Sequence, residues 1–275
     1  MKRFLILGAL FALSACQTTS QSGSDRASVS EPLNSEVVFG TEAIHDGEEY
    51  NTWKYIFRGD GRKTVVTMQN KVAFNLVPNP KTIEYDVRIL KSNLSVPVYY
   101  QERKKVEEEV ASLRGKEFKY VYKHKKATAE SLASFGDLQE GYVNLMGNKR
   151  DLVKSMIESA SASYFGGKTV TQDQKVLALN FCVVAGVYPG SGPCDSTQVY
   201  GYVAGKKLYG GRTVVVVDVD DDMTYDEQVI YIDGYFYVDL KTGTALFSEI
   251  KLSGMKRDGT DADIVKTRLV KLPTS

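Results

Sequence analysis

Apolar and polar residues alternate with a period of two along much of the chain after residue 36, a pattern typical of strands that bury one face. In the first such stretch, Trp53, Tyr55 and Phe57 occupy alternate positions, and a Gly-Asp-Gly turn separates them from the apolar segment 65–68. This arrangement predicts a β-hairpin. Further strands are expected at 72–77, 83–89, 118–122, 176–184, 198–203, 213–217, 228–232, 235–240, 245–252 and 264–272.

Two segments carry the apolar spacing of amphipathic helices instead. In residues 102–113, apolar side chains recur at i, i+4 and i+7, and Gly115 follows as a stop signal. Residues 151–164 hold a wider apolar face, and a pair of glycines closes its end. We therefore predict an α+β fold, in which about two helices pack on a mostly antiparallel sheet.

The first residues form a separate segment. Lys2 and Arg3 precede the apolar run 4–13. A permanent membrane helix needs about 20 apolar residues to cross a hydrocarbon core of about 30 Å, so this run is too short. Residues 1–15 therefore have the properties of a removable signal peptide.

The quartet Leu13-Ser14-Ala15-Cys16 resembles the lipobox of bacterial lipoproteins. The resemblance implies that Cys16 receives a diacylglycerol and further acyl chains such as palmitate, and that the mature chain begins there. Two or three acyl chains give a stable membrane anchor. In the enteric version of this family an Asp after the Cys favours inner-membrane retention, so Gln17 favours an outer-membrane anchor with the domain on the periplasmic side. The alternative is an ordinary secretory signal that ends at a cysteine by chance.

The segment after Cys16 is rich in Ser, Thr, Gln and Gly. Its low apolar content predicts a flexible tether over residues 16–35, which would hold the folded part roughly 25 Å from the bilayer. We divide the remaining chain into a β-rich subdomain, residues 36–95, and an α+β domain, residues 96–275.

The three cysteines support export independently. With Cys16 carrying lipid, Cys182 and Cys194 remain, and they flank a segment rich in proline and glycine. In an oxidising periplasm such a pair predicts a disulfide, which would stabilise the fold by roughly 3 kcal/mol. A zinc pair is the alternative, although the spacing is not Cys-x-x-Cys and the chain has 2 histidines.

Composition and charge narrow the functional classes. The chain is 43% hydrophobic, enough for a substantial core. Its 35 Lys and Arg nearly balance its 34 Asp and Glu, so charge gives no reason to expect a nucleic-acid partner. No cofactor is expected.

Acidic residues are densest just after residue 217. Asp218, Asp220 and Asp222 match the first ligand positions of a calcium-binding EF-hand loop, but Met223 and Val229 stand where that loop requires Gly and Glu. We interpret the cluster as a solvated turn between two strands, with a metal site at the three aspartates as the alternative.

Other motifs assign no catalytic residue. Residues 166–169, Gly-Gly-Lys-Thr, match the end of a phosphate-binding loop, but a predicted helix precedes them where that loop needs a strand, so they are interpreted as a helix C-cap. Prolines flank Ser191 where a nucleophile elbow requires glycines. Neither His45 nor His124 has a sequence context typical of a buried general base.

Lysines and tyrosines alternate around the predicted strand 118–122. We take Lys119, Tyr120, Lys123 and His124 as candidate binding residues for anionic lipid headgroups, lipopolysaccharide or glycan. The alternative is an exposed edge strand that lysines protect against further pairing.

The segment 235–252 resembles a hairpin of curli-secretion-type lipoproteins and related outer-membrane accessory lipoproteins. That resemblance implies an α+β domain that associates with partners. We therefore expect a lipid-anchored envelope protein that binds or scaffolds an envelope protein or glycan, without enzymatic activity. The alternative is a periplasmic hydrolase of peptidoglycan or glycan that uses paired carboxylates such as Asp218, Asp220 and Glu227.

Overall fold

A computed structural model of the chain describes residues 31–59, 61–79, 82–98, 101, 103–123, 126–129, 164–180, 198–225, 227–257 and 260–273. Its strands are β1 (Val37–Val38), β2 (Ile44–Gly59), β3 (Arg62–Pro78), β4 (Thr82–Ser95), β5 (Glu117–Lys123), β6 (Lys126–Ala129), β7 (Thr169–Val170), β8 (Lys175–Asn180), β9 (Gln198–Tyr209), β10 (Arg212–Tyr225), β11 (Gln228–Asp239), β12 (Ala245–Arg257) and β13 (Thr260–Lys271).

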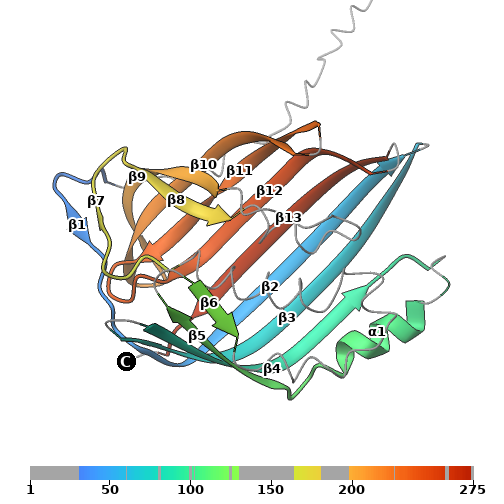
Figure 1. Cartoon of the computed structure of the whole chain (residues 1–275), viewed down its shortest axis with the longest axis horizontal. Helices are drawn as coiled ribbons and strands as arrows, with labels where there is room; N and C mark the ends of the chain where they lie inside the picture. Colours follow the sequence, from blue (N-terminus) through green and yellow to red (C-terminus); the bar gives the residue numbers. More distant parts are fainter. Residues whose placement is uncertain are drawn as a thin grey trace, which may run out of the picture.

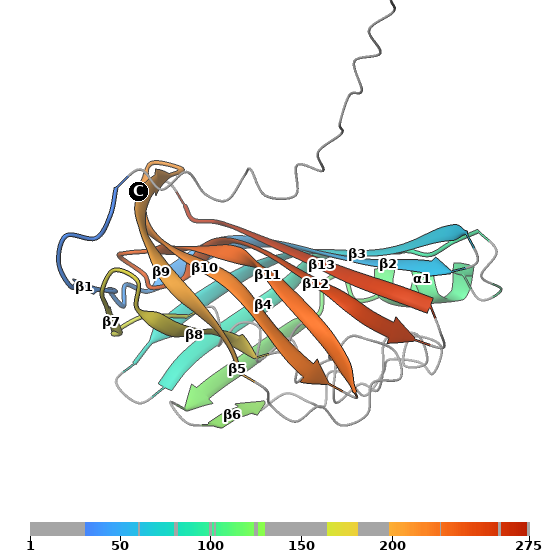
Figure 2. The same ribbon diagram turned by 90° about the horizontal axis from the view of Figure 1, so that it is seen from above.

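Eleven of these strands form one sheet in the order β6-β5-β4-β3-β2-β13-β12-β11-β10-β9-β8, with every neighbouring pair antiparallel (Figure 1). The sheet is strongly twisted and curved, so the strands at its two edges come forward on the same side (Figures 1 and 2). A small second sheet pairs β1 with β7.

The concave face of the large sheet is its buried face. On β2, the alternate residues Glu49, Asn51, Trp53 and Tyr55 are all buried, whereas Lys54 between them is exposed on the convex face. Strand register places apolar residues of β13, β12, β11 and β10 on the same concave side. One layer of alternating side chains therefore supplies most of the core.

Two predicted hairpins are confirmed. The first joins β2 to β3 at a turn in which Gly61 adopts a φ of 70°. The second joins β11 to β12, and there Gly243 adopts a φ of 66°. A positive φ costs glycine little, which explains why these two residues end the strands on either side of them.

The predicted α+β class is wrong. Within the described residues the fold is almost entirely antiparallel sheet, with one short helix, α1 (Arg103–Ala111), where the first helix was predicted. Apart from Tyr164, the second predicted helix, residues 151–164, lies outside the described residues. The strands are longer than predicted, and β2 pairs with β13, so residues 36–95 and residues 96–275 both contribute to one sheet. None of the described helices is long and apolar enough to span a membrane.

Candidate functional site

A cluster of charged and polar side chains interrupts the apolar concave face at its centre. Glu49 accepts hydrogen bonds from Arg268 Nη2 at 2.8 Å, from the Tyr85 hydroxyl at 2.9 Å and from Asn51 Nδ2 at 2.5 Å. Arg268 also donates from Nη1 to the carbonyl of Ala245 at 2.9 Å. Because β2, β4 and β13 place these groups on the same side of the sheet, residues far apart in sequence form one buried network.

The electrostatics of the cluster follow from its burial. Burial alone would raise the pKa of Glu49, but the charge and hydrogen bond of Arg268, together with the hydrogen bonds from Asn51 and Tyr85, lower it to about 2. Lys266 lies on the same face with 6% of its surface exposed. Burial lowers the pKa of Lys266 to about 8, the charge of Arg268 lowers it too, and Glu49 opposes them. Two cations therefore share one buried carboxylate.

Next to this cluster, β2 presents three aromatic rings in a row. Trp53, Tyr55 and Phe57 alternate along the concave face. The ammonium group of Lys266 lies 5.5 Å from the centroid of the Trp53 ring. The Trp53 indole N–H is buried and meets no hydrogen-bond acceptor in the part of the chain that the structure describes. The row runs from the charged cluster towards the end of the sheet where β2 turns into β3.

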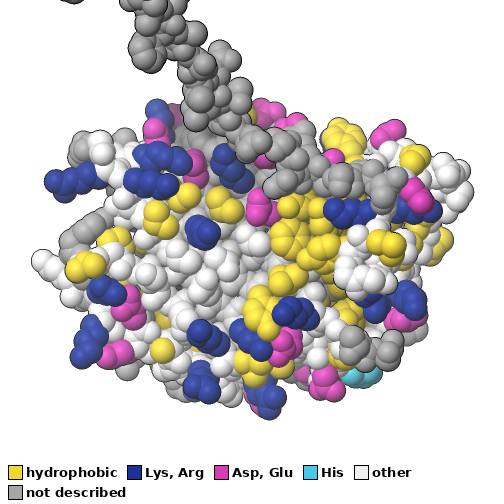
Figure 3. Space-filling model, turned by 180° about the vertical axis from the view of Figure 1, so that it is seen from behind, with side chains coloured by type: hydrophobic (Ala, Val, Ile, Leu, Met, Phe, Trp, Pro, Cys, Tyr) yellow, Lys and Arg dark blue, Asp and Glu magenta, His cyan; other side chains and the backbone are white. Residues whose placement is uncertain are grey.

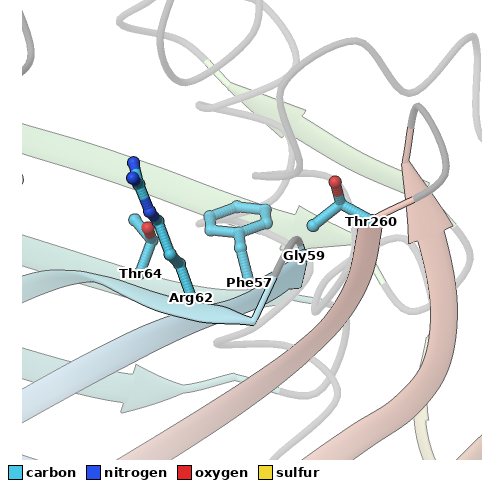
Figure 4. A pocket seen from close by; sticks show the side chains of 5 residues that line it. All are labelled: Phe57, Gly59, Arg62, Thr64 and Thr260. Atoms are coloured by element: carbon cyan, nitrogen blue, oxygen red, sulfur yellow. The ribbon is translucent and has the colours of Figure 1, made fainter.

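At that end, a cavity of about 430 Å³ opens beside the last ring of the row. It is lined by Phe57, Gly59, Arg62, Thr64 and Thr260. The four side chains project from the same side of their strands, with the Phe57 ring between Arg62 and Thr260 (Figure 4). Among the described residues no carboxylate forms an ion pair with Arg62, which is exposed. The cavity thus combines an aromatic surface, two hydroxyl groups and an available cation.

Gly59 forms part of the cavity wall because it lacks a side chain. A Cβ atom at this position would lie 3.0 Å from the hydroxyl oxygen and 3.2 Å from the methyl carbon of Thr260. Glycine therefore allows β2 and β13 to approach each other closely at the edge of the cavity.

We expect replacement of Lys266 by Met to stabilise the protein at neutral pH. Below pH 8, Lys266 is charged in both the folded and the unfolded state, and its burial penalty is fully present. At about 1.4 kcal/mol per pKa unit, the shift from 10.5 to about 8 corresponds to roughly 3 kcal/mol. Between pH 8 and 10.5 the folded protein loses this proton while the unfolded chain keeps it, so stability should rise with pH.

The measurement is urea unfolding of the wild type and of Lys266→Met across this pH range. The variant should be the more stable at pH 7, by up to about 3 kcal/mol, and the difference should disappear by pH 10.5. Lys54→Met, an exposed lysine on the convex face of β2, is the control. Equal stabilities of Lys266→Met and wild type at pH 7 would contradict the assigned burial penalty.

The acidic cluster predicted as a turn is part of a strand. Asp218, Asp220 and Asp222 lie in β10, where the register places them opposite Tyr235, Asp233 and Tyr231 on the convex face. Alternation with the buried residues Val217 and Val219 explains the strand, because valine fills the core side while aspartate faces outward. Within the described ranges no group of three or more His, Cys, Asp or Glu side chains is placed to hold a metal ion.

Asp220 and Glu227, two carboxylates of the hydrolase alternative, do not converge. Asp220 lies within β10, whereas Glu227 lies in the turn after Tyr225, at the end of that strand. Five residues of strand between Asp220 and Tyr225 span roughly 16 Å, beyond the separation of about 5–9.5 Å that glycoside hydrolysis uses. Asp218 and Asp220 lie together on the convex face of the sheet, and neither lines the cavity.

The structure describes only part of the other predicted sites. Lys119, Tyr120 and Lys123 lie in β5, where they pair in register with Asp86, Tyr85 and Thr82 of β4, but their side chains and His124 lie outside the described set. The edge-strand alternative is wrong for β5, because β6 pairs with its other side.

Cys16, Cys182 and Cys194 also lie outside the described residues, so lipidation and the disulfide stay predictions. Sequence reasoning missed Glu49, Lys266 and Arg268. The only signal for them in the sequence is that these charged residues occupy the same alternate positions of their strands as apolar residues do.

Comparisons with known proteins give distant likenesses. No protein-family model and no curated protein matches the chain. Among solved structures, a domain of an outer membrane lipoprotein-sorting protein from Vibrio parahaemolyticus is 10% identical, with 83% of this chain and 86% of that one covered and a TM-score of 0.17. A DUF1329 family protein from Desulfovibrio piger is also 10% identical, with 83% and 87% covered and a TM-score of 0.21. Superpositions this weak assign no fold family.

Proposed function

We propose that the protein is a lipid-anchored component of the bacterial envelope that binds an elongated apolar molecule carrying one acidic group. The observation that carries this proposal is the cavity at the end of the concave face, where Arg62 stands beside Phe57. The anchor rests on the resemblance of residues 13–16 to a lipobox. The cavity on the concave face would bind the ligand.

The chemistry of the cavity selects the class of ligand. Its volume falls in the range of small-molecule sites, about 300–1,000 Å³. A guanidinium group binds a carboxylate or phosphate through two parallel hydrogen bonds, and no protein carboxylate in the described residues competes for Arg62. The Phe57 ring offers an apolar surface next to it. An acidic head on an apolar stem matches both groups.

The row of aromatic rings gives the apolar part of the ligand a direction. From Phe57 to Trp53, the rings follow β2 over four residues, a distance of about 13 Å. The stem of the ligand would contact Phe57 first and would reach the Tyr55 and Trp53 rings, which are 3% and 6% exposed, only by displacing the groups that cover them. The unpartnered Trp53 indole N–H would then meet a polar atom only in a ligand long enough to reach it.

Binding also fits the described carboxylates better than hydrolysis does. The Arg268–Glu49 pair is satisfied within the protein, and the low pKa of Glu49 makes it a poor proton donor. The convex aspartates of β10 lie away from the cavity. The described groups hold no acid and base that face each other across the cavity.

The test is titration of the purified protein with a dansyl-labelled fatty acid and with its uncharged methyl ester. The wild type should bind the acid more tightly than the ester. A charge-assisted hydrogen bond is worth about 1.5–3 kcal/mol, so Arg62→Gln should weaken acid binding by about 10- to 100-fold and leave ester binding nearly unchanged. Phe57→Ala should weaken the binding of both.

Arg58→Gln is the matched control. Arg58 lies near the same end of β2, carries the same charge and is paired with Asp263 at 2.6 Å. This variant should bind the acid as the wild type does. Absence of saturable binding, or equal losses in Arg58→Gln and Arg62→Gln, would refute the proposed site.

A further inference from the structure

The convex face of the sheet carries a cluster of aromatic side chains near the β11–β12 hairpin. We define the convex aromatic patch as the half-buried Tyr209, Tyr235 and Phe247 together with Tyr237, which is 6% exposed. Their neighbouring ring centroids lie 5.1–6.1 Å apart. They come from β9, β11 and β12. Apolar side chains gather on this face of the molecule, with lysines and arginines around them (Figure 3).

Lysine side chains lie on a ring of the convex aromatic patch and on the neighbouring ring of Tyr50. The Lys207 ammonium group is 3.9 Å from the centroid of Tyr237 and donates a hydrogen bond to its hydroxyl. Further along the face, Lys71 and Lys271 each lie 5.1 Å from the centroid of Tyr50. Long side chains with a cationic tip cover the rings while the charge stays near solvent.

Strand register places the convex aromatic patch and Tyr50 with its lysines in one row. Phe247 of β12 pairs with Leu269 of β13, which pairs with Tyr50 of β2, which pairs with Lys71 of β3. Glu48 borders this row and binds both Lys71 and the Tyr50 hydroxyl. The row therefore runs across the strands, and aromatic, aliphatic and lysine side chains share one surface.

The N-terminal tether joins the folded part beside this row. Glu31 and Lys206 of β9 exchange two backbone hydrogen bonds, of 3.2 and 2.9 Å, and their side chains form an ion pair at 3.2 Å. Lys206 directly precedes Lys207. Cys16 and Glu31 are 15 residues apart (31 − 16). A chain of that length spans at most about 50 Å.

We propose that the convex aromatic patch rests on the phospholipid bilayer that holds the lipid of Cys16. A link of 15 residues leaves this side of the sheet within reach of the headgroups, where tyrosine and phenylalanine rings partition favourably and lysines reach lipid phosphates. The orientation of the domain rests on the proposed lipid anchor, whereas the affinity of the patch for a bilayer does not, and neither depends on the ligand of the concave face. This orientation turns the concave face away from the bilayer.

The experiment places a fluorescent reporter in the patch. The variant Phe247→Trp is reconstituted in vesicles of phosphatidylethanolamine and phosphatidylglycerol whose acyl chains carry bromine, a contact quencher. The chain has 1 native tryptophan, Trp53, which is buried on the concave face and supplies an unquenched background. The emission of the introduced tryptophan should be largely lost. Tyr235→Trp repeats the test at a second position.

Tyr231→Trp is the control, because Tyr231 is 58% exposed on the convex face of β11 and lies four residues, about 13 Å, from Tyr235 along that strand. Its emission should persist. Near a membrane surface each lysine contributes about 5-fold to partitioning, so the double variant Lys207→Gln/Lys271→Gln should weaken vesicle binding of the unlipidated Cys16→Ser chain by about 25-fold.

Flotation of the vesicles separates the two proposals. If the protein floats with the vesicles but no patch position is quenched, or Tyr231→Trp is quenched equally, the docking surface is refuted and the anchor stands. If the protein does not float, the anchor fails. The quenching pattern of the same chain at high vesicle concentration then decides the docking surface alone: selective quenching supports it, and its absence overturns it.

Discussion

Glu49→Gln should lower the free energy of unfolding by about 3–5 kcal/mol, because it leaves the buried Arg268 guanidinium without its counter-charge. Arg268 is 4% exposed, so solvent has little access to the guanidinium to replace the carboxylate. The bonds from Tyr85 and Asn51 would weaken at the same time. Native domains are stable by only about 5–15 kcal/mol, so urea unfolding at pH 7 should detect the change readily.

The pH dependence provides a second measurement. The folded pKa of Glu49, about 2, lies below its ordinary value of 4.5, so its contribution is complete above pH 4.5 and is lost as the pH falls towards 2. The wild type should show this acid loss, and Glu49→Gln should lack it. The double variant Glu49→Leu/Arg268→Met removes both charges and should be more stable than either single variant. Equal stability of wild type and Glu49→Gln would contradict the buried pair.

Asp239→Ala should destabilise the protein by about 3 kcal/mol, because one buried carboxylate supports both the β11–β12 turn and the Arg212 guanidinium. Asp239 is 1% exposed. It accepts hydrogen bonds from Arg212 Nε and Nη2 at 2.9 and 3.0 Å, and from the Thr242 amide and hydroxyl at 3.0 and 2.9 Å. The substitution removes all four bonds.

The substitution should also destabilise the two segments that hydrogen-bond to the β11–β12 turn. The Gly40 amide donates to the Leu240 carbonyl at 2.7 Å, and the Phe165 amide donates to the Gly243 carbonyl at 2.6 Å. Hydrogen exchange at these two amides should accelerate in Asp239→Ala. Asp222→Ala, which removes an exposed carboxylate of β10, should change stability by less than about 0.5 kcal/mol. Similar effects of the two substitutions would show that the Asp239 network is unimportant.

The local parts of this fold could be predicted from the sequence. Gly61 and Gly243 mark turns between alternating segments, and both hairpins are present. Neighbouring strands joined by short turns pair with little loss of chain entropy, so local sequence decides them. The pairing of β2 with β13 joins residues about 200 positions apart, and no local pattern specifies it. That single pairing joins the strands before residue 95 to those after residue 198 in one continuous sheet.

The buried charges could not be predicted for a related reason. In β13, the concave face carries Ile264, Lys266 and Arg268, and the convex face carries Val265 and Leu269. Both faces are thus part apolar, so the period of two does not decide which one is buried. Glu49, which makes burial of Arg268 favourable, lies 219 residues away. The acidic run of β10 was predicted as a turn because of its density of charge. Its aspartates nevertheless alternate with buried valines, which is the pattern of a strand.

The central position of β13 has a consequence for how the protein is made. This strand lies between β2 and β12 and is synthesised after both of them. Until it emerges, β2 and β12 each present an unpaired edge, and the halves of the sheet have nothing to join them. The sheet is therefore completed only after β13 has been synthesised, and the slow formation of such distant contacts leaves these two edges open to wrong pairing until then. Assembly of the sheet should therefore be most sensitive to changes in the middle of β13, near residue 264.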